Sequence, residues 1–145
     1  MSIFGSLDIS ASALSAERLR MDVTAENLAN AQSTRTANGG PYRRKEVVLE
    51  QSGGGFAGAL AQARSADGPN GGVKVAGIVE DTAPDRLVYD PGHPDANQQG
   101  YVRMPNVNPV TEMVDLISAS RSYEANVTAM QTAKQMFTKT LDLLR

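Results

Sequence analysis

The chain has 145 residues, 41% of them apolar, a formal net charge of −2 at pH 7 and no cysteine. This length suffices for one modest domain, and a charge so close to neutral gives no reason to expect nucleic acid or an anionic membrane as a partner. Because cysteine is absent, disulfide bonds, thiol catalysis and cysteine metal sites are excluded.

Residues 1–31 carry apolar side chains at alternating spacings of four and three, which is typical of a helix that buries one face. This N-terminal stripe consists of Leu7, Ala11, Leu14, Met21, Ala25 and Leu28, with Arg18 as its one polar member. The segment has neither the basic start nor the unbroken apolar core of a secretory signal, so we expect no cleaved signal peptide. No window approaches the roughly 20 apolar residues that cross a bilayer, so we also expect no membrane span.

The middle of the chain changes to a β pattern and predicts a small inserted domain. Short runs rich in β-branched residues lie at 46–50, 72–80 and 86–89, separated by glycine-rich segments. The insertion contains few large apolar residues and would be marginally stable by itself. Its basic run Arg43–Lys45 is followed at once by Glu46, which is typical of a solvated strand start.

Candidate chemical sites in the insertion are weak. The segment Gly53–Gly58 has the Gly-x-Gly-x-x-Gly spacing of a dinucleotide-binding turn, with Glu80 downstream, but the rest of the chain is too short for a doubly wound sheet. His93, with Asp90 and Asp95 nearby, is the one histidine and lies in a proline-rich turn, so we expect no metal site. No serine lies in a nucleophile elbow, so no catalytic residue, cofactor or small-molecule substrate is predicted.

Residues 108–145 predict one long helix. Asn108 can cap the free N–H groups at its start, and Pro109 is suited to its first position. Glu112 places a negative charge near the positive N-terminal end of the helix. The spacing along its apolar stripe alternates between three and four residues, and Ser120 and Lys134 are the two polar members. The stripe consists of Met113, Leu116, Ser120, Tyr123, Val127, Met130, Lys134, Phe137, Leu141 and Leu144. The outer face is small and uncharged, which is unusual for a helix in water. Such a helix spans roughly 55 Å, more than a domain of this size can bury, so we expect partners.

The predicted fold class is α+β, with the long N- and C-terminal helices paired as an antiparallel coiled coil and a small, mostly β domain inserted between them. The predicted parts are the N-terminal helix of the coiled-coil core at 1–35, the β-rich outer domain with flexible glycine-rich loops at 36–105, and the C-terminal helix of the core at 106–145. We expect an assembly seam formed by Leu7, Leu14, Met21 and Leu28 against Met113, Tyr123, Val127, Met130, Phe137 and Leu141.

Three asparagines, Asn27, Asn30 and Asn126, are candidates for fixing the register of the two helices through buried hydrogen bonds. Ordinary capping and surface amides are the alternative interpretation of the same residues.

Several blocks of the sequence resemble the flagellar axial proteins of the rod and hook. Asn-Leu-Ala-Asn-Ala at 27–31, followed by Gly-Pro-Tyr-Arg-Arg at 40–44, resembles the N-terminal signature of that family. Tyr-Val-x-Met-Pro-Asn-Val-Asn at 101–108, Glu-Met-Val at 112–114 and Ala-x-Arg-x-Tyr-Glu-Ala-Asn at 119–126 are similar, more specifically, to the proximal-rod subunits. The motif residues carried over are Asn27, Asn30, Tyr42, Arg43, Pro105, Asn106, Glu112, Arg121 and Asn126.

The resemblance implies a structural, non-enzymatic subunit of the bacterial flagellar basal-body rod. Its terminal helices are expected to polymerise into the helical drive shaft that transmits torque and encloses the export channel. The implied partners are other copies of the chain, other rod proteins and the flagellar type III export apparatus. The implied place is the rod within the periplasm, reached without a cleaved signal peptide. The alternative is a soluble helical adaptor or export chaperone.

Folding is expected to be coupled to assembly. Ordering the backbone costs roughly 1–2 kcal/mol per residue, and the two stripes of one chain bury too little apolar surface to offset this.

Overall fold

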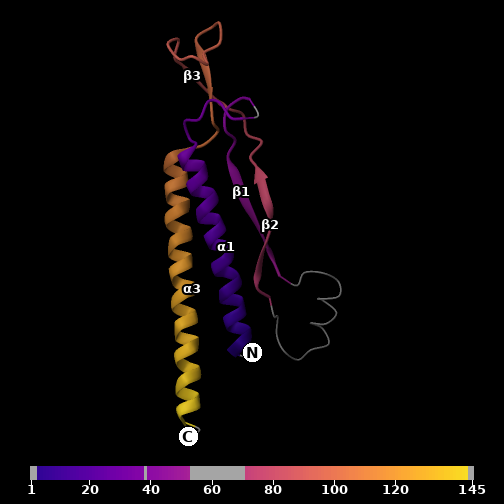
Figure 1. Ribbon diagram of the computed structural model, residues 1–145, viewed down its shortest axis with the longest axis vertical. Helices are drawn as coiled ribbons and strands as arrows, with labels where there is room; N and C mark the ends of the chain where they lie inside the picture. Colours follow the sequence, from indigo (N-terminus) through magenta and orange to yellow (C-terminus); the bar gives the residue numbers. More distant parts are fainter. Residues whose placement is uncertain (1–2, 38, 53–70, 144–145) are drawn as a thin grey trace. The chain divides into compact units, whose positions relative to one another are not determined.

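The computed structural model describes residues 3–37, 39–52 and 71–143. Its elements in chain order are helix α1 (Ile3–Ala29), strands β1 (Lys45–Gln51), β2 (Val73–Glu80), β3 (Arg86–Tyr89) and β4 (Tyr101–Met104), and helix α3 (Pro109–Leu143) (Figure 1). The chain is therefore α+β, as the sequence predicted, with a long helix near each end and small sheets between them.

The start of α3 follows from its local sequence. The Asn108 side chain accepts a hydrogen bond from the Val110 N–H at 3.0 Å, and the Asn108 carbonyl accepts the first helical bond from the Glu112 N–H. Pro109 then occupies the first helical position, where a missing N–H has no consequence. The predicted capping residues therefore begin the helix.

The strands form two separate two-stranded sheets, β1 with β2 and β3 with β4. The second sheet is antiparallel and pairs Arg86 with Met104, Leu87 with Arg103, Val88 with Val102 and Tyr89 with Tyr101. Side chains alternate between its faces, so Val102 is completely buried on one face while Leu87 and Tyr89 are exposed on the other. Gly100 precedes β4 with φ +79°, and a Cβ there would lie 2.9 Å from the Tyr89 ring, so glycine is required at this turn.

Contacts divide the chain into two compact units. Unit 1 comprises residues 1–19, 48–77 and 119–145, and unit 2 comprises 20–47 and 78–118. Both helices and the β1–β2 sheet contribute residues to each unit. The sequence predicted domain boundaries at 35 and 105, which separate the helices from the β insertion rather than dividing the chain by contacts. These boundaries stay a prediction.

Most of the buried side chains that the structure describes belong to unit 2. They are Val23, Thr24, Asn27, Ala31, Tyr42, Val102, Pro105, Val107 and Glu112. Among the described residues of unit 1, Ala16 and Ala119 reach the same degree of burial. The core of unit 2 is thus partly polar, and its polar members determine the site described next.

Candidate functional site

Asn27, in the last turn of α1, has a buried amide that uses all of its hydrogen-bonding capacity. Its Nδ2 donates to the carbonyl of Lys45 at 2.8 Å and to Oε2 of Glu112 at 3.0 Å. Its Oδ1 accepts from the Tyr42 hydroxyl and from the Lys45 N–H, both at 2.9 Å. An amide offers two donor hydrogens and an oxygen with two lone pairs, so this side chain is fully satisfied. Asn27 therefore connects the end of α1 to the start of β1 and the first turn of α3.

Glu112 is a carboxylate with only 1% of its surface exposed. Its second oxygen, Oε1, accepts a hydrogen bond from Arg44 Nε at 2.6 Å, and Arg44 Nη2 also lies 3.5 Å from Oδ2 of Asp115. A buried charge is tolerated only when it is paired and hydrogen-bonded, and Glu112 meets this condition through Arg44 and Asn27. The hydrogen bond to Glu112 raises the pKa of the Arg44 guanidinium, against burial, which lowers it. The Arg44 guanidinium therefore keeps its positive charge beside Glu112.

Tyr42 is buried against Ala31 and Val107. Burial, followed by the nearby carboxylates of Glu26, Glu112 and Glu80, raises the pKa of Tyr42 to about 12. The phenol is thus protonated at neutral pH and able to donate to Asn27. We call Asn27, Tyr42, Arg44, Lys45 and Glu112 the junction cluster, because they join α1, β1 and α3 within unit 2.

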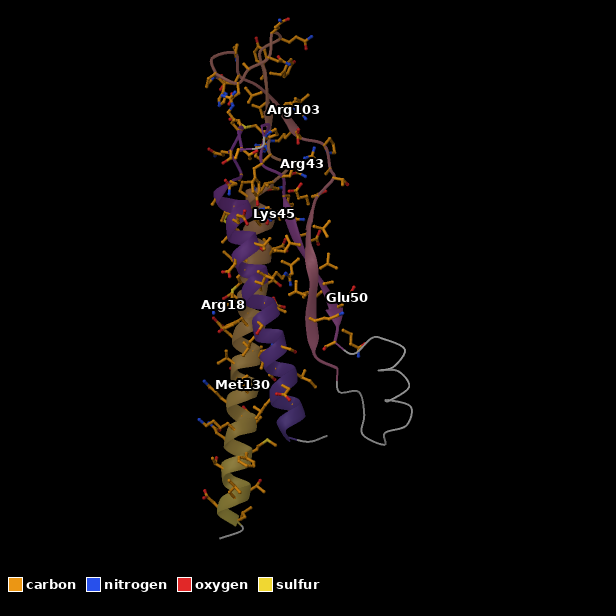
Figure 2. All side chains as sticks on the ribbon, turned by 45° about the vertical axis from the view of Figure 1, so that its right-hand side comes forward. Arg18, Arg43, Lys45, Glu50, Arg103 and Met130 are labelled. Carbon is orange, nitrogen blue, oxygen red and sulfur yellow. The ribbon has the colours of Figure 1, made fainter. Side chains whose placement is uncertain are left out.

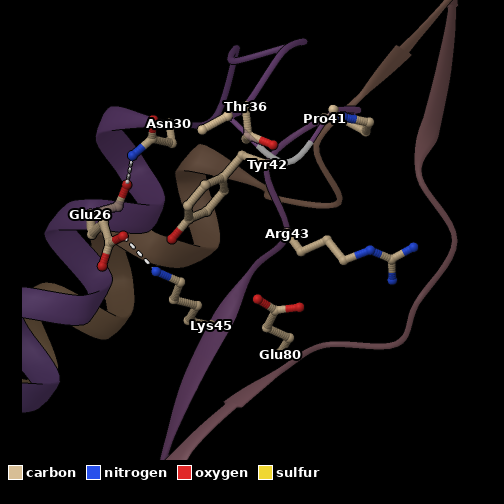
Figure 3. Close-up of a pocket in the computed structure, with 10 residues that line it drawn as sticks. Glu26, Asn30, Thr36, Pro41, Tyr42, Arg43, Lys45 and Glu80 are labelled. Carbon is tan, nitrogen blue, oxygen red and sulfur yellow. Dashed lines mark hydrogen bonds and ion pairs between the residues drawn. The ribbon is translucent and has the colours of Figure 1, made fainter.

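An open cleft of about 480 Å³ lies beside the junction cluster and is lined by the end of α1, the loop before β1 and the end of β2. In Figure 3 the Lys45 ammonium reaches the Glu26 carboxylate, at 2.7 Å, next to the Tyr42 ring. Glu80 and Arg43 also line the cleft. Because both signs of charge share these walls, the cleft presents no single charge to a ligand.

The first two turns of α3 carry an exposed apolar face. Val110, Met113, Val114 and Ile117 follow the i, i+3, i+4, i+7 spacing of one helix face, and each is between 46% and 65% exposed. We call these four residues the α3 stripe. Apolar side chains are also exposed near the other end of the helix, at Met136, Phe137, Leu141 and Leu143. A contiguous apolar stripe in water marks an interaction site.

The structure places the predicted assembly seam in two groups. Half-buried members are Leu7, Leu14, Met21, Leu28, Tyr123, Val127 and Met130, and exposed members are Met113, Phe137 and Leu141. Burial in a single chain does not measure contacts that neighbouring subunits complete, so the seam stays a prediction.

The motif residues lie in different environments. Asn27, Tyr42, Pro105 and Glu112 are buried, Asn30, Asn106 and Asn126 are half-buried, and Arg43 and Arg121 are exposed. Asn30 and Asn126 donate to carbonyls four residues back in their own helix, at 3.0 and 2.9 Å. Of the three candidate register residues, Asn27 is the one whose side chain bonds to other elements within the described part of the chain.

Sequence reasoning missed Arg44 and Lys45. The basic run was expected to be solvated, which is wrong for Arg44, since only 21% of its side chain is exposed. A signal was available in Glu112, because an acid in the first turn of a helix that becomes buried requires a basic partner.

The weak chemical candidates resolve into turn chemistry where they are described. His93 Nδ1 accepts a hydrogen bond from the Asp95 N–H at 3.1 Å, and the Asp90 carboxylate accepts one from the Gly92 N–H at 3.1 Å. The segment Gly53–Gly58 lies outside the described residues. Within the described ranges, no group of three or more His, Cys, Asp or Glu side chains is placed to hold a metal ion. No described helix combines the length and apolarity needed to cross a bilayer.

Comparison with known proteins gives consistent results. The family described as "Flagella basal body rod protein" matches residues 7–35, and "Flagellar basal body rod FlgEFG protein C-terminal" matches residues 98–143. The chain is 53% identical to the flagellar basal-body rod protein FlgC of Bacillus subtilis strain 168, over 99% of both chains. It is 49% identical to the FlgC of Escherichia coli O6:H1, over 99% of this chain and 98% of the relative. It is 42% identical to the FlgC of Borreliella burgdorferi, over 100% of this chain and 99% of the relative.

Proposed function

Because the chain belongs to the FlgC family of flagellar basal-body rod proteins, whose members are structural rather than catalytic, we propose that it polymerises with other rod proteins through its terminal helices. The polymer is the helical drive shaft that transmits torque and encloses the export channel. The near-full-length likeness to rod proteins supports this function over that of a soluble adaptor or export chaperone.

The helices of one subunit pair as an antiparallel coiled coil, with 1–35 and 106–145 as the core domain and 36–105 as the outer domain. The bond from Asn27 to Glu112 supports this pairing, because it joins the end of one helix to the beginning of the other. The subunit reaches the rod, within the periplasm, through the flagellar type III export apparatus and without a cleaved signal peptide.

The observation that carries assembly is the exposed apolar surface of α3. The α3 stripe is open to water in the single chain, and Leu141 and Leu143 are 50% and 87% exposed. Burying apolar surface contributes about 25 cal/mol per Å², so neighbouring subunits that cover these side chains stabilise the polymer.

Substituting Met130 tests the role of the helix pair in assembly. Met130 is half-buried on α3 and is labelled in Figure 2. We expect Met130→Asp to abolish incorporation into rods and motility while export continues, because an unpaired carboxylate cannot be enclosed between helices. Incorporation is measured by immunoblotting isolated basal bodies, and export by secreted protein. Met130→Leu, which conserves volume, is the control and should assemble. Normal rods containing Met130→Asp would contradict the proposal.

A further inference from the structure

The guanidinium of Arg44 contacts two carboxylates on one face of α3. It donates to Glu112 through Nε at 2.6 Å, and its Nη2 lies 3.5 Å from Asp115 Oδ2. Glu112 and Asp115 are three residues apart, so they occupy adjacent positions on one side of the helix. A planar guanidinium can reach both carboxylates only at one axial position along α3, beside Glu112 and Asp115.

The backbone of Arg44 is held on both sides. Its N–H donates to Oδ1 of Asn106 at 2.9 Å, and its carbonyl accepts from the Asp81 N–H at 2.8 Å. Asn106 lies in the short connection between β4 and α3, and Asp81 directly follows β2. These two hydrogen bonds therefore fix the backbone position from which the Arg44 side chain extends to α3.

The next residue, Lys45, is fixed to α1. Both its N–H and its carbonyl are bonded to the Asn27 side chain, at 2.9 and 2.8 Å. Arg44, directly before β1, and Lys45, the first residue of β1, thus connect the helices, since Lys45 binds α1 and Arg44 binds α3. All of these groups belong to unit 2.

From this geometry we propose that Arg44 is a positioning residue that fixes the axial register of α1 against α3; the inference rests on the helix pairing proposed above. Apolar stripes with spacings of three and four repeat every seven residues, so a slip of one heptad, about 10 Å, superimposes them again. Polar contacts do not repeat in this way. In a slipped pair Glu112 loses both Arg44 and Asn27 and becomes a buried, unpaired charge. Buried polar groups specify register in other helix pairs by the same logic.

The chain has no cysteine, so spin labels can be placed at two chosen positions in the full-length protein. Asp22 on α1 and Thr111 on α3 are exposed in unit 2 and are suited to Asp22→Cys and Thr111→Cys. Double electron–electron resonance then measures the distance between the labels. We expect one narrow distribution in the labelled reference chain, because both labels lie in unit 2, where the buried junction cluster is complete within a single chain. Adding Arg44→Met should broaden it or shift it by roughly 5–10 Å, corresponding to slips of one turn to one heptad.

Arg103→Met is the matched control. Arg103 also binds a buried carboxylate of unit 2, that of Asp85, but it lies outside the junction cluster. This variant should leave the distribution unchanged, which separates register from a general loss of stability.

Each outcome decides the inference. A narrow, unshifted distribution in a helical Arg44→Met chain overturns it. If Arg44→Met loses its circular dichroism signal, Arg44→Lys decides, because lysine keeps the charge without the two-pronged geometry. A broadened distance in that variant supports the inference, and an unchanged one overturns it. A reference chain without a defined distance overturns both the register role and the helix pairing, whereas rod incorporation of the Met130 variants reports on assembly alone.

Discussion

The sequence offered three asparagines equally as candidates for fixing the helix register, but their side chains make different hydrogen bonds in the structure. Asn27 makes four hydrogen bonds to residues 15 to 85 positions away, whereas Asn30 and Asn126 donate to carbonyls four residues back. The capping and back-bonding of the latter two are local and follow from general helix chemistry. The partners of Asn27 depend on how distant segments meet, which no local pattern predicts.

Replacing Asn27 should be far more damaging than replacing Asn126. Asn27→Ala leaves the Lys45 backbone groups and the Tyr42 hydroxyl without their partner, and each unsatisfied buried group costs about 1–3 kcal/mol. We expect the free energy of unfolding to fall by about 3 kcal/mol, measured by urea denaturation followed by circular dichroism. Asn126→Ala should cost less than about 1 kcal/mol, because the Asn126 side chain donates to the Ser122 carbonyl within its own helix. Equal losses in the two variants would contradict the assigned role of Asn27.

At the scale of elements, the two helices were predictable from the sequence. Expected helical segments at 1–31 and 108–145 correspond to α1 and α3, because apolar periodicity and caps are local signals. Strands β1, β2 and β3 also match the expected runs to within one residue at each end. Strand β4 was missed, because its pairing with β3 across the Gly100 turn is what makes it a strand.

The buried positions on the helices differ from the large apolar residues of the predicted stripes. On α3 they are Glu112 and Ala119, one residue before Met113 and Ser120. On α1 they include Ala16 and Val23, two residues after Leu14 and Met21. Small side chains allow close packing, so the bulkier neighbours are left half-buried or exposed. Periodicity predicts a helix well, but it does not determine which adjacent row is buried within the chain and which is left for other subunits.

Ile117 provides a test of this division on the α3 stripe. Its side chain is 55% exposed, so Ile117→Asp should change the free energy of unfolding of the isolated chain by less than about 0.5 kcal/mol. Incorporation into basal bodies should nevertheless fall strongly, because the carboxylate would be buried against a neighbouring subunit. Ser118→Asp, at the adjacent exposed position outside the stripe, is the control. An Ile117→Asp chain that assembles like the parent would show that the α3 stripe faces water in the rod.

Burial is distributed unevenly over the whole molecule. Among the described residues, unit 2 contains nine buried side chains and the hydrogen-bonded junction cluster, whereas the buried side chains of unit 1 are Ala16 and Ala119. Each unit includes part of both helices, so the difference is between segments of the same helices rather than between helix and sheet. Sequence composition gave little indication of this difference, because the polar residues that complete unit 2 are buried only through their mutual contacts.

This distribution predicts where the isolated chain opens. Local opening takes less free energy where few side chains are buried, and tenfold faster exchange corresponds to about 1.4 kcal/mol. We expect amides of 20–31 and 109–118 in the purified chain to exchange at least about tenfold more slowly than those of 3–15 and 125–143, as measured by hydrogen–deuterium exchange mass spectrometry. In isolated basal bodies the second group should become protected, because neighbouring subunits enclose those helix segments. Equal protection of all four segments in the free chain would mean that unit 1 is already complete, and assembly would then add contacts without completing the fold.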